Sequence, residues 1–248
     1  MNKTVLITGG AGGIGSAIAL KLAEKNYDIV INYFSSETKA FELQKRISDE
    51  YKVRCLVIKA DVSKEDEVEM MIKRIEEELG YVDILINNAA IDLPDLYDLK
   101  TAEQFRRVLD VNVVGAYNCA NRVYKHMLDK KFGRIVNISS TNGINTYYPM
   151  CFDYDASKAA LISLTHNMAV QYAPYVNVNA IAPGFIGTEK ELEGYDEEFL
   201  KQETEKILVG RYGKPEEVAD LIAFLISDQA NYINNTIIRI DGGQMFSN

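Results

Sequence analysis

The sequence predicts an α/β fold in which a doubly wound parallel sheet carries helices on both faces. Short, nearly continuous apolar runs alternate with amphipathic stretches along the chain, and such runs are typical of parallel strands buried on both sides. A glycine-rich turn follows the first apolar run directly. No Pro/Ser-rich linker or low-complexity tract interrupts the alternation, so residues 1–248 are expected to form a single domain.

Seven apolar runs are the predicted strands. They span residues 5–8, 29–33, 55–60, 84–87, 135–139, 176–181 and 236–240. Helical patterns lie between them at about 13–25, 36–50, 64–79, 101–130, 154–172 and 215–227. Thr101 and Gln104 have the spacing of a capping box and are expected to open the fourth helix. Strict alternation of strands and helices implies right-handed crossovers.

One segment, residues 187–206, breaks this alternation. Eight acids and three lysines give its stretch 189–206 a net charge of −5. Ligands of a doubly wound sheet bind beyond the carboxyl ends of the strands, so an insertion after the sixth strand is placed to act as a lid. A solvated helical excursion is the alternative that charge alone supports equally well.

Composition and charge narrow the class of protein. Hydrophobic residues make up 47% of the chain and charged residues 25%, which is typical of a globular protein with a full core. The net charge of −9 disfavours a nucleic-acid partner. No apolar run reaches the ~18 residues of a membrane span, and no signal peptide is evident, so we expect a cytoplasmic protein without a membrane partner. Cys55, Cys119 and Cys151 are expected to be free thiols, and with His126 and His166 they form no zinc-type spacing, so no metal is expected.

The glycine-rich turn joins the first predicted strand to the first predicted helix. Gly10 begins a G-x-G-x-x-G pattern, and Gly9, Gly13 and Gly15 fit T-G-x-x-x-G-x-G instead. Glycines let backbone N–H groups approach a pyrophosphate closely, and the start of a helix attracts that anion. The strand–glycine–helix context favours a dinucleotide site over a flexible turn.

Further motifs follow in an order known from one family. They are Asn87-Asn88-Ala89-Ala90, Asn112, Ser139-Ser140, Tyr154-x-x-x-Lys158, Pro183-Gly184, the run RYGKPEEV at 211–218, and Asp241-Gly242-Gly243. Together they resemble the short-chain dehydrogenase/reductase family along essentially the whole chain. The segments GRIVNISS, NAIAPGF and GRYGKPEEVA look most like the 3-oxoacyl-acyl-carrier-protein reductases. The resemblance implies a Rossmann-type fold, a homotetramer, and hydride transfer between NAD(P)(H) and a ketone or secondary alcohol.

Two positions depart from the family pattern, which usually has Gly at both. Ala90 is small enough to keep a close backbone approach feasible. Asn235 is the residue type best able to replace Gly at positive φ, so its turn is expected to survive.

Tyr154 and Lys158 are the candidate catalytic pair. They lie four residues apart in a predicted helix and therefore share one face. A neighbouring ammonium would stabilise the phenolate and lower its pKa, which suits Tyr154 as general acid/base. The resemblance implies that Lys158 also bonds the nicotinamide ribose, that Asn112 anchors a water linked to Lys158, and that Ser140, favoured over Ser139, holds the substrate oxygen.

The resemblance also implies the residues that contact the cofactor. Besides the catalytic pair these are Gly9, Gly13, Ile14, Gly15, Asp61, Val62, Asn88, Ala89, Pro183, Gly184, Ile186 and Thr188. Asp61 could instead serve as a helix N-cap, a role for which Ser63 competes.

The end of the second strand indicates NADP(H), with NAD(H) as the alternative. NAD-binding members carry an acid there to bind both ribose hydroxyls, but this chain has Tyr33. Ser35 or Ser36 could hydrogen-bond a 2′-phosphate, whereas Asp28 lies at the wrong end of the strand. No Arg or Lys lies within the glycine turn, which argues for a small preference.

The substrate is expected to be a small molecule or an acyl thioester, with a 3-oxoacyl thioester favoured. Small polyols, sugars or cyclic alcohols are the alternative on the same scaffold, and a non-catalytic NAD(P) sensor is disfavoured by the intact catalytic set. Cys151 is expected to line the substrate pocket, against the alternative of a solvent-facing thiol.

Four cations near the fifth strand form a candidate landing patch for an acidic carrier protein. They are Lys125, Lys130, Lys131 and Arg134, and residues 173–175 are expected to flank the same entrance. The acids of the predicted lid would repel such a partner within a Debye length of ~8 Å. We therefore expect weak carrier docking and good activity on small or coenzyme-A-linked ketones.

Overall fold

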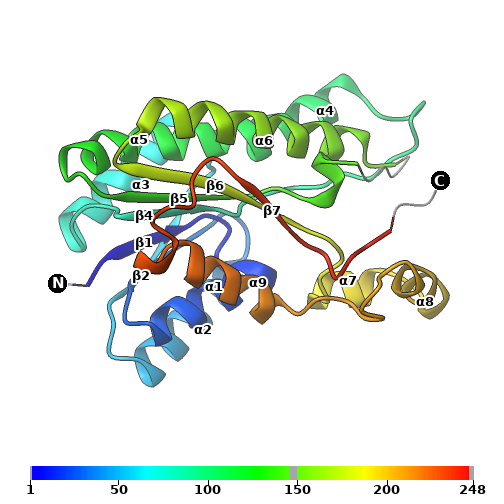
Figure 1. The fold of residues 1–248 in the computed structure, drawn as a ribbon, viewed down its shortest axis with the longest axis horizontal. Coiled ribbons are helices and arrows are strands. Elements are labelled where there is room, and N and C mark those ends of the chain that lie inside the picture. Colours follow the sequence, from blue (N-terminus) through cyan, green and yellow to red (C-terminus); the bar gives the residue numbers. More distant parts are fainter. Residues whose placement is uncertain (1, 146–149, 246–248) are drawn as a thin grey trace.

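The computed structural model describes residues 2–145 and 150–245, and the seven predicted strands form one parallel sheet (Figure 1). Their order is β3-β2-β1-β4-β5-β6-β7. The strands are β1 (Thr4–Ile7), β2 (Asp28–Tyr33), β3 (Cys55–Lys59), β4 (Ile84–Asn87), β5 (Gly133–Ile138), β6 (Val176–Pro183) and β7 (Ile237–Ile240). The predicted α/β, Rossmann-type fold is therefore confirmed.

Helices cover both faces of the sheet, as the buried apolar runs require. They are α1 (Gly13–Glu24), α2 (Glu37–Glu50), α3 (Glu65–Glu78), α4 (Ala102–Leu109), α5 (Gly115–Asp129), α6 (Phe152–Tyr172), α7 (Glu189–Gly194), α8 (Glu197–Glu205) and α9 (Pro215–Leu225). Figure 1 shows α1, α2 and α9 on one face and α3, α5 and α6 on the other. The sheet separates two hydrophobic cores, one on each face. Val5 and Ile7 pack into one core and Leu6 into the other, because successive strand side chains point to opposite faces.

The predicted helix 101–130 is divided in the structure, which corrects that prediction. A π-helical segment, Asp110–Val114, separates α4 from α5. The Asn112 carboxamide accepts a bond from the Ile91 N–H at 2.8 Å and donates to the Ile91 carbonyl at 3.0 Å. These bonds tie the helix to the loop after β4, and π-helical insertions of this kind are frequent at functional sites. The predicted capping box of Thr101 and Gln104 is present at the start of α4.

Segment 187–206 contains two short helices, α7 and α8. The side chains of Thr188 and Asp196 accept hydrogen bonds from the N–H groups of Glu191 and Phe199, so each helix begins at a capping residue. The segment follows β6 and lies beyond the carboxyl edge of the sheet (Figure 1). Asn235, in the turn before β7, has φ +60°, as its replacement of glycine predicts. None of the helices in residues 2–145 and 150–245 has the length and apolar composition that a bilayer crossing requires.

A buried ion pair fastens the loop between β4 and α4 to the start of α6. The Lys100 ammonium lies 2.8 Å from the Asp153 carboxylate, and their side chains are 2% and 0% exposed. Lys100 Nζ also donates to the Leu93 carbonyl oxygen. Asp153 immediately precedes Tyr154, so this pair sets the position of the loop relative to a candidate catalytic side chain.

Replacing Lys100 by Met should lower the free energy of unfolding by about 3–5 kcal/mol, because it leaves the Asp153 carboxylate buried without its cation. Urea denaturation followed by circular dichroism measures the change. Lys45→Met, on the exposed side of α2, is the matched control and should change stability by less than about 0.5 kcal/mol. A Lys100→Met loss no larger than that of the control would contradict the structural role assigned to the pair.

Candidate active site

Two neighbouring cavities lie along the carboxyl edge of the sheet. One has a volume of about 450 Å³ and lies between the glycine turn and the ends of β2 and β3. The other, of about 370 Å³, lies between the ends of β5 and β6 and the helices of segment 187–206. Asn88, Ala90, Ile91 and Thr188 are in the walls of both. The two chambers therefore form one elongated cleft at the point where the strand order reverses between β1 and β4, the place where doubly wound sheets bind ligands.

The glycine turn forms one wall of the 450 Å³ chamber. Gly9 and Gly13 have φ +59° and +51°, a region that favours glycine. A Cβ at Gly15 would lie 2.5 Å from the Gly9 carbonyl oxygen, so the helix can approach the turn only without one. Asn88 Nδ2 donates to the carbonyls of Thr8 and Gly9 at 3.0 and 2.9 Å and holds the turn in place. The N–H groups and positive dipole at the start of α1 are thus available to a phosphate.

Hydroxyl groups and a lysine surround the end of β2. Tyr33, Ser35, Ser36 and Lys39 line the chamber. The Tyr33 hydroxyl donates to Glu37 at 3.1 Å, and the Lys39 ammonium pairs with Glu189, the first residue of α7, at 2.8 Å. Lys39 is a cation in the chamber wall that the sequence motifs did not reveal.

Asp61 and Val62, after β3, form the far wall of the same chamber. Asp61 accepts bonds from the N–H and hydroxyl of Ser63 at 3.0 and 2.7 Å, and it pairs with Arg107 at 2.9 Å. Burial raises the pKa of the Asp61 carboxyl, but the bonds from Ser63 and Arg107 outweigh burial and lower it overall. Asp61 is therefore an acceptor fixed in the wall as well as a local cap.

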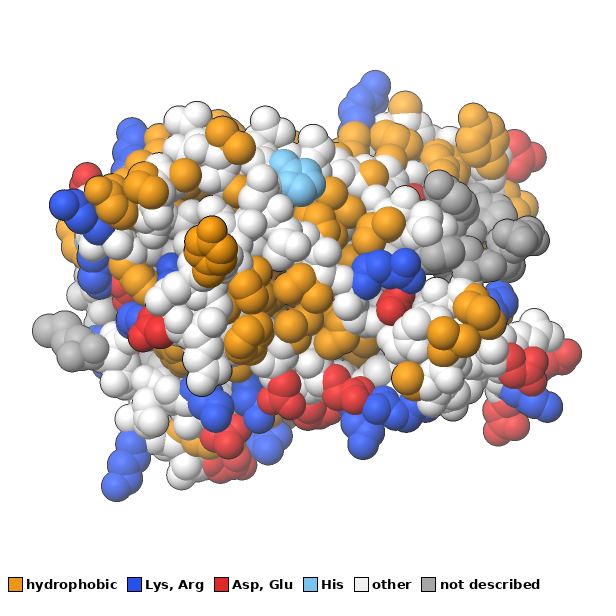
Figure 2. All heavy atoms as spheres, viewed as in Figure 1, with side chains coloured by type: hydrophobic (Ala, Val, Ile, Leu, Met, Phe, Trp, Pro, Cys, Tyr) orange, Lys and Arg blue, Asp and Glu red, His pale blue; other side chains and the backbone are white. Residues whose placement is uncertain are grey.

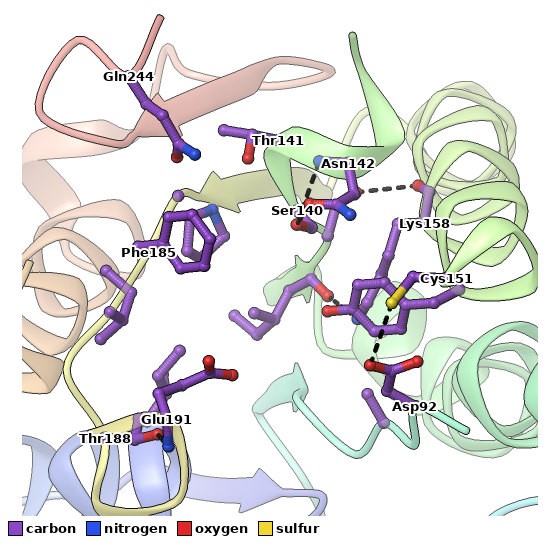
Figure 3. Close-up of a pocket in the computed structure, with 18 of the residues that line it drawn as sticks. Asp92, Ser140, Thr141, Asn142, Cys151, Lys158, Phe185, Thr188, Glu191 and Gln244 are labelled. Atoms are coloured by element: carbon purple, nitrogen blue, oxygen red, sulfur yellow. Dashed lines mark hydrogen bonds between the residues drawn. The ribbon is translucent and has the colours of Figure 1, made fainter. Parts of the chain in front are cut away.

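Tyr154, Lys158 and Ser140 meet in the 370 Å³ chamber (Figure 3). Tyr154 and Lys158 project from one face of α6, and the Lys158 ammonium lies 5.3 Å from the centre of the Tyr154 ring. Ser140, just after β5, hydrogen-bonds the Tyr154 hydroxyl through its own hydroxyl group. The Ser139 hydroxyl instead donates to the Lys158 carbonyl at 2.9 Å, which leaves Ser140 as the serine directed at the phenol.

Burial shifts the pKa values of the candidate pair in opposite directions. The pKa of Tyr154 is raised by burial, and the carboxylates of Asp92 and Glu191 raise it further, although the bond from Ser140 opposes them. Burial lowers the pKa of Lys158 to about 8. Lys158 Nζ donates to the Ile138 carbonyl at 2.8 Å rather than to the phenol. The expected lowering of the Tyr154 pKa by Lys158 is therefore not found in this structure, because burial and acids dominate.

Asn112 supports the site through hydrogen bonds to the backbone and to α6 rather than from the cavity wall. Besides its bonds to Ile91, its Nδ2 donates to the Ser157 hydroxyl at 2.9 Å, and that hydroxyl donates to the Tyr154 carbonyl at 2.7 Å. Asn112 is not one of the described residues that line the two cavities. These bonds show directly that Asn112 supports α6 through Ser157, and the water that Asn112 is expected to anchor stays a prediction.

Segment 187–206 faces the 370 Å³ chamber, which we call the substrate chamber because the candidate catalytic residues line it. Glu191, Tyr195 and Phe199 line the chamber, and the two rings stack with their centres 4.4 Å apart. On the opposite side, the Cys151 sulfur lies 3.6 Å from an Asp92 carboxylate oxygen (Figure 3). Cys151 thus lines the pocket, as one of its two interpretations predicts.

Most of the other candidate residues lie in the walls of the cleft, whereas Gly15 lies behind the glycine turn and lines neither chamber. Ile14, Pro183, Gly184, Ile186 and Thr188 line the substrate chamber, and Ala89 lines the other. Sequence reasoning missed several wall residues that belong to no motif, namely Asn32, Lys39, Asp92, Arg107, Asn142 and Gln244. Only their tertiary positions identify them.

The predicted landing patch does not lie near the pocket, and this prediction is wrong. The patch and residues 173–175 are at the starts of β5 and β6, whereas the pocket is at their ends. The patch lies at one end of β5 and the pocket at the other, so the length of this six-residue strand, about 20 Å, separates them. Lys130 pairs with Asp83 at 2.5 Å, and Arg134 is buried and donates to Asn231, so two of the four cations are already engaged.

Comparisons with known proteins show which family the chain resembles along nearly its whole length. A family model described as enoyl-(acyl carrier protein) reductase matches residues 9–245. The chain is 37% identical to the 3-oxoacyl-acyl-carrier-protein reductase FabG of Staphylococcus epidermidis, covering 98% of this chain and 99% of that protein. It is 39% identical to the acetoacetyl-CoA reductase of Rhizobium meliloti, with 100% of both covered. A solved short-chain dehydrogenase/reductase mutant from Serratia marcescens superposes with a TM-score of 0.91 at 31% identity, covering 97% of each chain.

The environment of Cys151 predicts a slow thiol. Burial and the adjacent Asp92 carboxylate raise its pKa to about 12, so little thiolate exists at pH 8. Iodoacetamide should label Cys151 on the order of a hundredfold more slowly than free cysteine at pH 8, with the rate rising towards pH 10. Peptide mass spectrometry measures the rate, and Cys119, which is fully buried, is the internal control. Labelling as fast as free cysteine would show that the sulfur does not lie against Asp92.

Proposed function

The chain belongs to the short-chain dehydrogenase/reductase family, and from that premise we propose that it reduces a 3-oxoacyl thioester or a related small ketone with NADPH. It is an NAD(P)-dependent oxidoreductase that interconverts ketones and secondary alcohols. The observation that carries the assignment of its catalytic residues is the convergence of Ser140, Tyr154 and Lys158 in one chamber beside a phosphate-binding turn.

The chain's own residues account for binding and proton transfer. A bound nicotinamide cofactor supplies or accepts the hydride, and Ile14, Gly184, Ile186 and Thr188 would hold its ring end in the substrate chamber. The Ser140 hydroxyl donates a hydrogen bond to the substrate oxygen and so orients the carbonyl. Tyr154 donates its phenolic proton to that oxygen as negative charge develops on it. The raised pKa of Tyr154 keeps the phenol protonated at neutral pH, so the side chain carries the proton that the reduction consumes.

Lys158 and Asn112 support this proton transfer. The ammonium of Lys158 lies 5.3 Å from the centre of the Tyr154 ring, where its charge would offset part of the negative charge left after proton transfer, although burial and acids dominate the pKa of the resting phenol. Asn112 fixes α6 through Ser157 and thereby positions Tyr154. The intact set of acid, orienting hydroxyl and cation argues against a non-catalytic NAD(P) sensor.

The comparisons and the charge of the cleft together support the proposed substrate class. FabG and acetoacetyl-CoA reductase are the relatives that match essentially the whole chain. The carboxylates of Glu191 in α7 and of Asp92 line the substrate chamber, and the expected basic patch lies at the starts of the strands, away from it. Carrier-protein docking should therefore be weak, and small or coenzyme-A-linked 3-oxo compounds should be turned over at least comparably to carrier-linked ones.

NADP(H) is the proposed cofactor, with NAD(H) used less well. Tyr33, Ser35 and Lys39 surround the expected 2′-phosphate position, and the described residues of β2 itself contribute no carboxylate to the chamber, although Glu189 of α7 lines it beside Lys39. The pair between Lys39 and Glu189 weakens the cation, so the preference should be modest. Asp28 is at the amino end of β2, where it pairs with Arg54.

A cytoplasmic homotetramer is the proposed form of the protein. Strand β7 is at one edge of the sheet, and Figure 2 shows hydrophobic side chains gathered in the middle of the face over β7 and α9. Phe224 of α9 is exposed, and exposed apolar surface next to a sheet edge is typical of an interface. The free thiols of Cys55, Cys119 and Cys151 are consistent with a reducing compartment. Size-exclusion chromatography with light scattering tests the oligomeric state.

NADPH oxidation should be observed with acetoacetyl-CoA and methyl acetoacetate. A panel of polyols and sugars with NADP⁺ tests the alternative substrate class.

Tyr154→Phe should lower turnover by ~10²-fold or more, because only the proton donor is lost. NADPH binding, followed by fluorescence, should stay near wild type. Tyr175→Phe, at the opposite edge of the sheet, is the matched control. A Tyr154→Phe variant that keeps more than a tenth of wild-type turnover would mean that the acid/base is misassigned.

Lys39→Ala should raise the KM for NADPH about 5- to 10-fold and leave the KM for NADH nearly unchanged, because only NADPH carries the phosphate that the ammonium binds. Lys45→Ala, also on α2 and exposed, should change neither. Steady-state kinetics with both cofactors measure the difference. A wild-type kcat/KM that favours NADH tenfold, or an equal effect of Lys39→Ala on both cofactors, would overturn the NADP assignment.

A further inference from the structure

Gln244 is a buried polar residue in the substrate chamber whose carboxamide the proposed mechanism does not use. It follows β7 by four residues and is 5% exposed. Its side chain lines the chamber, and Figure 3 shows it reaching inward beside Thr141. Its Oε1 has no hydrogen-bond partner among the residues that the structure describes. Buried polar atoms are normally paired, so a carboxamide left in this state is a candidate contact for a ligand.

The fold itself does not depend on this carboxamide. The Gln244 segment is held by its backbone, whose N–H donates to the Asp241 carbonyl at 3.0 Å and whose carbonyl accepts from Arg239 at 3.3 Å. The side chain packs against Gly184, where a Cβ would lie only 2.4 Å from Oε1. An apolar side chain of the same length would fill this space without burying a polar atom. Packing alone therefore does not explain a glutamine at this position.

The charge of the chamber limits which group can meet Gln244. Asp92 and Glu191 bring carboxylates into the walls, and Lys158, bonded to Ile138, is the one cation among the described wall residues. An anionic substituent would be repelled by the two acids. The remaining polar groups near Gln244, the side chains of Thr141 and Asn142, are uncharged (Figure 3). The group that binds there is thus uncharged. Oε1 itself can only accept a hydrogen bond, but a half-turn of the side-chain amide exchanges Oε1 with Nε2 and presents a donor to an uncharged oxygen of the ligand.

We propose that Gln244 is a specificity-determining residue that hydrogen-bonds a second, uncharged carbonyl oxygen of the substrate, as in a 3-oxo ester or thioester. Ser140 and Tyr154 bind the reacting ketone oxygen, and the Gln244 Nε2 donates to the other carbonyl. Two hydrogen bonds at separate points fix the orientation of the substrate. This inference rests on the proposed ketone reductase function and adds the residue that selects among ketones.

The test compares methyl acetoacetate with 2-hexanone, a ketone of equal chain length that lacks the second carbonyl. Gln244→Met keeps the length of the side chain and removes its hydrogen bonds, and Gln244→Glu keeps its shape and removes the donor. Both variants should lower the ratio of the two kcat/KM values by about tenfold or more, mainly through a higher KM for the ester. Gln229→Met, an exposed site outside the cleft, is the matched control and should keep the wild-type ratio.

Each outcome decides the inference. A ratio that stays within twofold of wild type in both variants overturns it, and so does an equal loss with both ketones, which would indicate a merely structural role. The thermal midpoint and the KM for NADPH separate that case from misfolding or a damaged cofactor site.

Wild-type protein should also turn over acetoacetate at least tenfold less efficiently than its methyl ester, and Glu191→Gln should narrow the gap. Equal use of the anion would refute the requirement for an uncharged group. Wild-type protein that reduces no ketone would instead refute the proposed function, and this inference with it.

Discussion

The parallel direction of every strand places all functional segments of this protein at one edge of the sheet. Strand order reverses between β1 and β4, so the helices that follow these two strands leave in opposite directions and open a crevice. The glycine turn lies in that crevice, and Asn88 braces it by bonding to Thr8 and Gly9. Ser140, Gly184 and Gln244 reach the same crevice because β5, β6 and β7 end there as well. The chemistry of the site depends on this single geometric constraint.

Within the crevice, burial is the force that sets the charge states. The same desolvation raises the pKa of Tyr154 and lowers that of Lys158, because it disfavours an anionic phenolate and a cationic ammonium alike. A phenol that holds its proton is suited to protonating the oxygen of a reduced carbonyl. The acids Asp92 and Glu191 act in the same direction on Tyr154. In the proposed mechanism the same two carboxylates would also disfavour anionic substrates, so proton supply and substrate choice would share one electrostatic cause.

The sequence predicted the fold and most of the site because those features are encoded locally. Strands that are buried on both faces need continuous apolar runs, and each of the seven runs is a strand in the structure. Asn235 takes positive φ because of its own side chain, and the capping box of Thr101 and Gln104 spans only three residues. The π-helical segment at Asn112 was not predictable from periodicity, since it arises from bonds to Ile91 and Ser157 on other elements. The misplaced landing patch shows the same limit, because neighbours of one strand can lie at opposite edges of the sheet.

By itself, the sequence determined the strand–helix order, the glycine turn, the family and the Tyr154–Lys158 pair, each of which depends on residues close together in the chain. Tertiary structure alone decided that Lys39 meets Glu189 beside the 450 Å³ chamber and that Gln244 shares a cavity with Tyr154, ninety residues earlier in the sequence. It also decided that burial, rather than the neighbouring ammonium, governs the Tyr154 phenol. Spacing along the chain fixes local conformation, but desolvation and long-range contacts depend on which surfaces the folded sheet brings together.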